Sequence, residues 1–384
     1  MKMAVLIVGG GIVGLSCAWE AARRGFAVTL LERGAIGGQA SGAAAGMLAP
    51  FSENGEGPDD FFRLCLESLG MYPEWVREIE EASGERAEFV RSGSLHLAMH
   101  GADRQPLLER LAWQRAFGGG CEWVDDAALR SLEPAVAPEA LGALYSPAEA
   151  HVHAPKLVAA LEKACRRTGV RLVDGAGELL SLSVEPGTGA VRAVLSGGEY
   201  TGDLAVICIG AWSGGLAERL GVRIPIHPIR GQICAYDSPT VRPRHLLFSS
   251  QAYWAAKADG TLVCGASEDD AGFDRSVTEA GIGRLVRWSE RVLPMLHGAA
   301  PTRSWAGLRP ATLDGWPLLG PVPLSPRLFL AAGHYRNGIL LSPATAALVG
   351  RWLAAGGGPG GRELLPFAPD RFASFTATVE GVPG

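Results

Sequence analysis

Three glycines near the start of the chain have the spacing of a phosphate-binding turn. Gly9, Gly11 and Gly14 form a GxGxxG pattern that follows a short apolar run and opens a segment with helical periodicity. In such a turn the first glycine permits a tight bend, the second lets a pyrophosphate approach the backbone, and the third allows close helix–strand packing. The first N–H groups of the helix, at Ile12 and Val13, would carry partial positive charge toward the phosphates.

An acidic residue stands where a dinucleotide-binding unit needs one. Glu32 ends a second apolar run, and a carboxylate at that point accepts hydrogen bonds from a ribose hydroxyl. A glycine-rich turn in a fold without a ligand is the alternative. Because strand, helix and acid are all in place, the pattern predicts dinucleotide binding.

A second glycine pair distinguishes between the dinucleotides. Gly37 and Gly38 follow Glu32 and Arg33 and precede Ser41, whose hydroxyl and neighbouring amides can extend the phosphate cradle. A nicotinamide dehydrogenase has no need of this extension, which resembles that of glutathione-reductase-like FAD proteins of the second type. FAD is therefore the predicted cofactor.

Two arginines late in the chain could hold a carboxylate. Arg309 and Arg336 lie in apolar, glycine-containing surroundings, where an unpaired guanidinium would be costly. The carboxylate of an amino acid fits the planar guanidinium through two hydrogen bonds. The alternative pairs each arginine with an internal Asp or Glu. Tyr253, judged alone, is more often a packing residue.

The elements around these residues alternate between helices and strands. Apolar patterning predicts a strand–helix–strand unit at 3–8, 12–24 and 27–31. Further helices are expected at 60–81, where Pro73 should kink or divide the helix, at 155–168, near 282–293, and from Ser342 to Gly356. Strands are expected at 179–184, 190–195 and 204–209, as a three-stranded meander, and at 232–236 and 261–265.

Composition and charge exclude several classes of protein. The 384 residues carry a net charge of −5 with no basic stripe, so nucleic acid and anionic membranes are not expected partners. Seven scattered cysteines without a CxxC pair indicate buried thiols in a reducing compartment. No run is long enough to span a bilayer, so the cytoplasm is the expected location. His151 and His153 lack a third ligand, and no metal site is predicted.

Four stretches of the chain are similar to one family. SGAAAGML at 41–48, GASEDDAGFD at 265–274, SWAGLRPATLDGWPLLGPV at 304–322 and AAGHYRNGILLSPAT at 331–345 resemble the D-amino-acid oxidase superfamily, and within it the bacterial glycine oxidases of thiazole biosynthesis. The resemblance implies an α/β fold, in which a Rossmann-like FAD-binding domain of the glutathione-reductase type 2 is interleaved with an α+β substrate domain carrying an antiparallel sheet. We expect FAD-binding parts at 1–88, 148–222 and 304–384, the last with a C-terminal helix and tail, and substrate parts at 89–147 and 223–303.

The resemblance also assigns roles to individual residues. Arg309 would hold the substrate carboxylate with help from Tyr253, Arg336 would lie beside flavin and substrate, and Met47 would limit the size of the substrate side chain. These four are the implied catalytic residues. Together with the glycine turn, the expected FAD-binding residues are Gly9, Gly11, Ile12, Val13, Gly14, Glu32, Arg33, Ala40, Ser41, Ala45, Gly46, Met47, Gly210, His334, Tyr335, Arg336, Asn337, Gly338, Ile339 and Leu340.

The implied reaction is oxidative deamination of a small amino acid by hydride transfer to flavin N5, with glycine giving glyoxylate, ammonia and hydrogen peroxide. Gly307 stands where monomeric sarcosine oxidases attach the flavin to a cysteine, so the resemblance implies non-covalent FAD. Glu268 and Gln251 depart from the family's pattern and would favour a more polar amine if they reach the pocket.

Several alternatives stay open from the sequence. Within the superfamily they are a D-amino-acid or sarcosine oxidase and a D-amino-acid dehydrogenase. Outside it they are a nicotinamide dehydrogenase and a nucleotide-binding protein without redox activity. Members of the family often self-associate, so a homo-oligomer is as open as a monomer.

Overall fold

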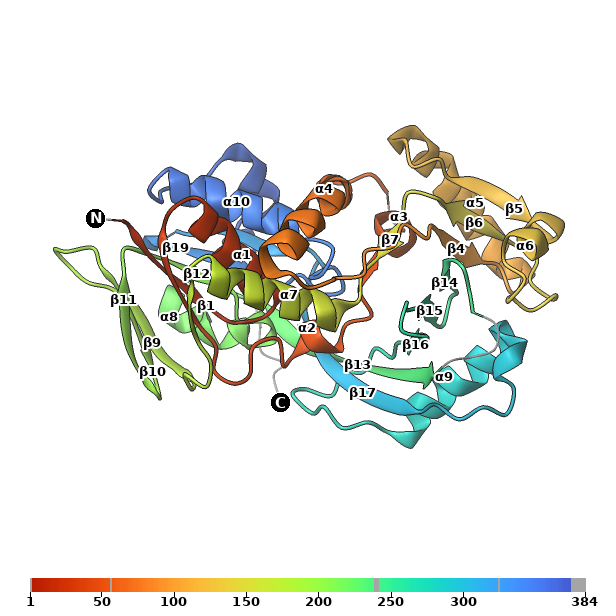
Figure 1. Ribbon diagram of the computed structural model, residues 1–384. Coiled ribbons are helices and arrows are strands. Elements are labelled where there is room, and N and C mark those ends of the chain that lie inside the picture. The colour runs from red at the N-terminus through yellow and green to blue at the C-terminus, as the bar shows by residue number, and fades with distance from the viewer. Residues whose placement is uncertain (1, 56, 238–241, 324, 374–384) are drawn as a thin grey trace, which may run out of the picture.

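A mostly parallel sheet built on the N-terminal strand–helix–strand unit forms one lobe of the molecule (Figure 1). The computed structural model describes residues 2–55, 57–237, 242–323 and 325–373. β1 (Ala4–Val8) lies between two other strands of a six-stranded sheet. Four of its five residues are buried, as expected for a strand that is covered on both faces. The order of that sheet is β18 (Leu318–Val322), β19 (Ser325–Ala332), β12 (Leu204–Ile207), β1, β2 (Ala27–Leu31) and β8 (Arg171–Val173).

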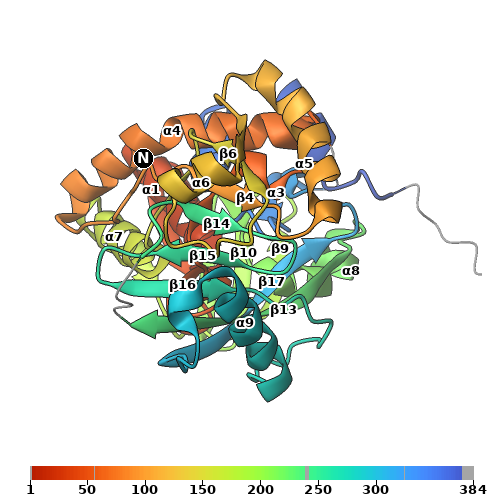
Figure 2. The ribbon, with the colours of Figure 1, turned by 90° about the vertical axis from the view of Figure 1, so that its right-hand side faces the viewer.

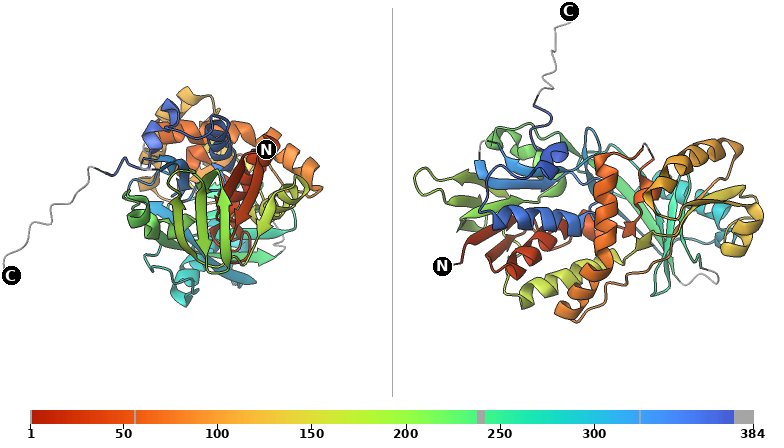
Figure 3. Two further views of the ribbon diagram at one scale, coloured as in Figure 1. Left: turned by 90° about the vertical axis from the view of Figure 1, so that its left-hand side faces the viewer. Right: turned by 90° about the horizontal axis from the view of Figure 1, so that it is seen from above.

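Helices cover one face of this sheet and a small meander covers the other (Figure 3). Val5 and Ile7 of β1 pack into a core with the helices, whereas Leu6 packs toward the meander. The helices are α1 (Ile12–Arg23), α4 (Asp60–Ser83), α7 (Ala154–Arg167) and α10 (Ser342–Ala354). The meander consists of β9 (Leu179–Val184), β10 (Val191–Leu195) and β11 (Gly198–Gly202).

An eight-stranded, mostly antiparallel sheet forms the second lobe (Figure 2). Its order is β17 (Arg303–Thr312), β13 (Ile226–Asp237), β16 (Thr261–Gly265), β15 (Tyr253–Ala256), β14 (Leu246–Phe248), β4 (Ser94–Leu97), β6 (Gly142–Ser146) and β5 (Glu122–Asp125). Outer helices of this lobe are α5 (Gly101–Gln114), α6 (Asp126–Leu132) and α9 (Glu279–Val292). The two sheets confirm the predicted fold class.

Short elements connect the lobes. They are α2 (Ala40–Ala43), α3 (Pro50–Glu53) and a two-stranded ribbon of β3 (Met47–Leu48) and β7 (Ala150–His151), and α8 (Ala217–Leu220) follows β12. One face of the eight-stranded sheet packs on the segment from Ala45 to Ala49, so a chain segment of the first lobe meets the second sheet there. None of the helices in the described part of the chain is long and apolar enough to cross a membrane.

One expected strand was wrong, and one of the two outcomes expected at Pro73 did not occur. The third strand of the meander is β11, and Leu204–Ile207 instead pairs with β1 in the parallel sheet. All four residues of β12 are buried, and such an unbroken apolar run is typical of a parallel strand covered on both faces rather than a meander strand. The helix at Asp60–Ser83 runs through Pro73 without being divided.

The expected boundary at residue 304 does not match the strand pairing. β17 pairs with β13 along its whole length, from Arg303 to Thr312, within the eight-stranded sheet. We therefore propose that the third FAD-binding part begins after Thr312 rather than at 304.

Candidate active site

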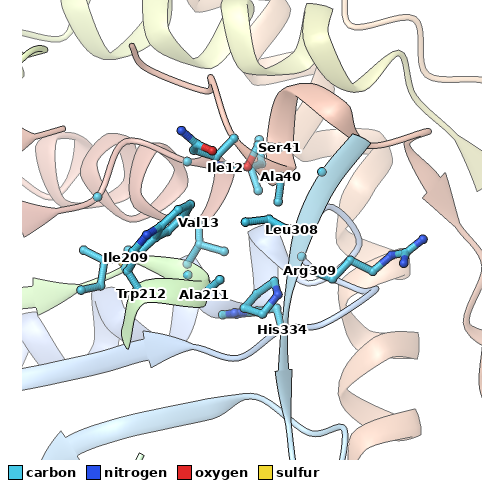
Figure 4. A pocket seen from close by; sticks show the side chains of 18 of the residues that line it. Ile12, Val13, Ala40, Ser41, Ile209, Ala211, Trp212, Leu308, Arg309 and His334 are labelled. Carbon is cyan, nitrogen blue, oxygen red and sulfur yellow. Dashed lines mark hydrogen bonds between the residues drawn. The ribbon is translucent and has the colours of Figure 1, made fainter. Parts of the chain in front are cut away.

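A cavity of about 440 Å³ starts at the carboxyl ends of β1, β2 and β12 and extends to β15 and β17. The carboxyl ends of parallel strands, at the point where the strand order reverses, are the usual ligand site of such sheets. Figure 4 shows Ile12, Val13 and Ser41 at one part of this cavity and His334 across from them. The long β17 strand brings Leu308 and Arg309 to its other end.

The glycine turn has the close contacts that its sequence predicts. Gly9 has φ +112°, and a Cβ there would lie 2.4 Å from the carbonyl oxygen of Cys208. A Cβ on Gly14 would lie 1.8 Å from the carbonyl oxygen of Gly9, so only glycine lets α1 approach the strand this closely. Gly11 is the residue before α1, which places the first N–H groups of the helix against the cavity.

Two side chains hold the turn in place. The Glu32 carboxylate accepts from the N–H of Gly10 at 2.6 Å and from the N–H of Gly34 at 3.0 Å. The Ser41 hydroxyl accepts from the N–H of Ile12 at 2.9 Å. Each oxygen can accept a further hydrogen bond, so both side chains could also meet a ribose or a phosphate.

Most of the expected FAD-binding residues line the cavity. They are Gly9, Gly11, Ile12, Val13, Glu32, Arg33, Ala40, Ser41, Ala45, Gly46, Met47, Gly210, His334, Tyr335, Arg336, Gly338 and Ile339. Gly14, Asn337 and Leu340 lie behind its wall: Gly14 packs on Gly9, Leu340 is part of the core, and Asn337 is buried. The FAD-binding role expected of these three residues stays a prediction.

An aromatic stack that the sequence did not reveal closes the end of the cavity near β2. The guanidinium of Arg33 lies 4.0 Å from the ring centroid of Trp212. Trp212 in turn stacks on Phe273, with centroids 5.5 Å apart. Arg33 follows β2 and Trp212 follows β12, so both come after strands of the parallel sheet. That position was the only signal in the sequence that could have indicated their contact.

Arg309 presents a guanidinium that no acidic side chain neutralises directly. Its Nη1 donates to the carbonyl oxygen of Ser267 at 2.9 Å, and within the described residues no carboxylate lies within 4.0 Å of it. A Cβ on Gly231 would lie 2.5 Å from the guanidinium carbon, so glycine at 231 makes room for it. Figure 4 shows Leu308 and Arg309 leaving β17 in opposite directions, as neighbours on a strand do.

Arg336 differs, because it lies between two carboxylates. Its Nη2 is 3.3 Å from Glu53 and its Nη1 is 2.9 Å from Glu268. The alternative of an internal acidic partner thus applies to Arg336 and not to Arg309. Glu53, also missed from the sequence, has a side chain only 3% exposed, and burial raises the pKa of its carboxyl.

The remaining residues of this end are apolar or neutral. Tyr253 is buried and lines the cavity beside Met47, and burial raises the pKa of its phenol above the usual value. His334 is buried, with Nε2 at 3.0 Å from the Thr345 hydroxyl, and burial lowers its pKa to about 4. His334 is therefore neutral near pH 7.

The two departures from the family's pattern have different outcomes. Glu268 does not itself line the cavity, but it forms an ion pair with Arg336, which does. Gln251 is exposed, and its backbone N–H donates to the Ser249 hydroxyl at 3.3 Å. At the expected position of a flavin-bearing cysteine, a Cβ on Gly307 would lie 2.7 Å from the Ala43 Cβ, which leaves little room for a side chain.

Residues 4–352 match the family described as FAD dependent oxidoreductase, DAO. The chain belongs to this DAO family. It is 34% identical over 347 residues to the glycine oxidase of Geobacillus kaustophilus, which covers 90% of this chain and 91% of that protein. It is also 34% identical to the bifunctional protein ThiO/ThiG of Synechocystis, over 97% of this chain and 54% of that protein. The crystal structure of the Geobacillus kaustophilus glycine oxidase superposes with a TM-score of 0.90 at 32% identity, covering 96% of this chain and 99% of that one.

This DAO family member uses FAD, and its cavity fits the cofactor on physical grounds. The glycine turn leaves backbone close to the cavity where a Cβ would clash, and the start of α1 offers N–H groups to a diphosphate. The acceptor oxygens of Glu32 suit a ribose hydroxyl. The free guanidinium of Arg309 then lies at the opposite end of the cavity, where a small anion could bind.

Proposed function

We propose that this DAO family member oxidises a small amino acid, and that glycine is its substrate. Glycine, water and oxygen would give glyoxylate, ammonia and hydrogen peroxide. Bound FAD supplies a hydride acceptor, so the chain has to bind the amino acid, orient its α-carbon and exclude water. The observation that carries the proposal is the unneutralised guanidinium of Arg309 at the end of the FAD cavity.

The substrate carboxylate would bind to Arg309. Only Nη1 of this guanidinium is engaged by the Ser267 carbonyl, and a guanidinium has five N–H donors. A carboxylate held by two of the remaining donors has a fixed orientation, which would direct the α-carbon toward the flavin. No general base is required of the chain for hydride transfer from a neutral amine.

The size of the site supports a substrate with little or no side chain. Met47 and Tyr253 line the same end of the cavity, and a Cβ on Gly265 would lie 2.2 Å from the Tyr253 hydroxyl oxygen, so this tyrosine is closely packed. A larger side chain would have to displace buried groups. Glycine is therefore favoured over D-alanine and D-proline, whose α-carbons carry a side chain.

The cellular setting is part of the same proposal. One relative carries the name ThiO/ThiG, which supports a place in the thiazole branch of thiamine biosynthesis. All seven cysteines are buried and unpaired, which fits the reducing cytoplasm.

A substrate panel tests the proposal. Purified holoprotein should be bleached by glycine without oxygen and should release peroxide with oxygen, faster than with sarcosine, D-alanine or D-proline. A kcat/KM for D-alanine above that for glycine would contradict the glycine assignment. Bleaching by glycine without peroxide formation would point to a dehydrogenase instead.

A matched pair of arginine variants tests the role of Arg309. Removing a charged, bidentate contact should raise the KM for glycine at least about 100-fold in Arg309→Ala, while FAD stays bound. Arg303, on the same strand, has a side chain 60% exposed and provides the control, because Arg303→Ala should leave KM unchanged. An unchanged KM in Arg309→Ala would refute this role.

A further inference from the structure

Arg336 is held on two sides by carboxylates of very different exposure. On the inner side Glu53, 3% exposed, lines the cavity. On the outer side Glu268, 48% exposed, pairs with Nη1 at 2.9 Å. The guanidinium itself is 38% exposed and lines the cavity between them.

The two arginines at this end of the cavity are therefore not equivalent. Arg309 donates to a backbone carbonyl and leaves its charge available to a ligand. The charge of Arg336 is already matched by Glu53 and Glu268. A substrate with one carboxylate finds one open guanidinium, and a second carboxylate would have to compete with an acid of the chain.

We propose that Glu268 is a specificity-determining residue, which keeps a second anionic group of the substrate away from Arg336. This inference rests on the proposed function, since it places the first carboxylate of the amino acid on Arg309. The disfavoured substrates are glycine derivatives with an acidic substituent, such as an N-carboxymethyl group. Neutral substituents of similar size do not meet this repulsion.

Glu268 is the exchangeable partner of Arg336, and Glu53 is the permanent one. An ion pair that is about half exposed is screened by water and salt, whereas a buried carboxylate that loses its cation is strongly disfavoured. Tyr335, at φ +47°, donates its N–H to the Pro310 carbonyl at 3.0 Å and so fixes the backbone next to Arg336. Neutralising Glu268 should therefore leave Arg336 in place, with its outer N–H groups free.

The test measures binding of two unreactive ligands to the holoprotein, through the change in the flavin absorbance spectrum. Methoxyacetate has one carboxylate, and diglycolate carries a second one on an otherwise similar chain. Neither contains an amine, so the measurement does not require turnover. In Glu268→Gln and Glu268→Ala the ratio of the Kd for diglycolate to that for methoxyacetate should fall at least about fivefold, as expected for loss of one partly screened repulsion.

Glu199→Gln is the matched control. Glu199 forms an ion pair with Arg192 on the meander, with both side chains 45% exposed, and lies on β11, away from the cavity. The ratio of the two Kd values in Glu199→Gln should equal that of the unmodified protein. Added salt should lower this ratio in the unmodified protein but not in Glu268→Gln. A ratio that falls less than fivefold in both Glu268 variants, or that falls equally in Glu199→Gln, overturns the proposal. If the ratio changes as expected but glycine is not oxidised, the proposed function fails and the assignment of Glu268 stands.

Discussion

Both hydrogen-bond donors of Ser52, its backbone N–H and its hydroxyl, donate to the carboxylate of Glu149. Oε1 accepts from the Ser52 N–H at 2.8 Å and Oε2 accepts from the Ser52 hydroxyl at 2.6 Å. Arg110 donates to the Ser52 carbonyl at 3.0 Å, so the backbone of this residue is held from both sides. Ser52 directly precedes Glu53 on α3, so Glu149 fixes the residue next to the buried partner of Arg336.

Replacing Glu149 should change how stability depends on pH. Burial raises the pKa of this carboxyl to about 7 from 4.5. The folded chain then binds the proton more tightly than the unfolded chain, so this contribution to stability is complete below about pH 4.5 and is lost as the pH rises through about 7. The shift corresponds to about 3 kcal/mol over this window.

The measurement compares melting temperatures of the unmodified protein and Glu149→Gln between pH 4.5 and 8. Gln cannot titrate, so the Tm of the unmodified protein should fall relative to that of Glu149→Gln as the pH rises. The difference should level off above about pH 7.5. Glu199→Gln, at an exposed ion pair, should show no such trend. A constant difference for Glu149→Gln would show that this carboxyl titrates normally in the folded state.

Two helical glycines should respond in opposite ways to the same substitution. In Gly14→Ala the new Cβ would lie 1.8 Å from the Gly9 carbonyl oxygen. That oxygen belongs to the backbone, and the Cβ is fixed to the backbone of α1, so neither can move away freely. We expect loss of FAD binding by at least about 100-fold, because the turn that faces the diphosphate must open. Gly70 lies in α4 with no atom within 4 Å of an added Cβ, so Gly70→Ala should bind FAD normally and gain about 0.5–1 kcal/mol in stability.

FAD affinity measured by flavin fluorescence on the refolded apoproteins distinguishes these outcomes. Near-normal affinity in Gly14→Ala would mean that the contact between helix and turn relaxes without disturbing the cradle. A Tm below that of the unmodified protein for Gly70→Ala would reveal a packing neighbour that the helix surface does not show.

The cradle was predictable because each of its requirements is local. The turn, its glycines and Glu32 fall within one strand–helix–strand unit, where spacing alone fixes their relative positions. The same holds for β1, α1 and β2, whose observed bounds agree with the sequence patterns to within a residue at most ends. Local pattern could not place Leu204–Ile207, because a buried run of this length fits a meander and a central strand equally well until its neighbours are known.

The far end of the cavity depended on contacts between distant segments. Glu53 lies more than 200 residues before Arg336 in the chain, and nothing in its own surroundings marks it as the partner of that arginine. Trp212 and Phe273 likewise meet only because a loop of the second lobe returns to the first. Such pairs follow from the arrangement of the two sheets, which no local periodicity contains.

The contact between Phe273 and Trp212 should slow the release of FAD. Phe273 is 54% exposed and stacks on the outer side of Trp212, whose ring also faces Arg33 at the wall of the cavity. Arg275 of the same loop donates to Gln39 at 2.8 Å, so the loop is fastened to the first lobe at a second point. The loop therefore covers the cavity end lined by Arg33 and Trp212.

Phe273→Ala would remove one wall of this stack without touching the cavity lining itself. Loss of an aromatic contact of about 0.5–1.5 kcal/mol corresponds to an FAD dissociation rate about 2- to 12-fold higher. The rate can be followed as flavin fluorescence appears after dilution with an excess of a competing apoflavoprotein. Leu365, 68% exposed and away from the cavity, supplies the control, because Leu365→Ala should release FAD at the unmodified rate. An unchanged rate in Phe273→Ala would mean that Trp212 and Arg33 hold this end of the cofactor without the loop, and that the fastening at Gln39 serves only the packing of the two lobes.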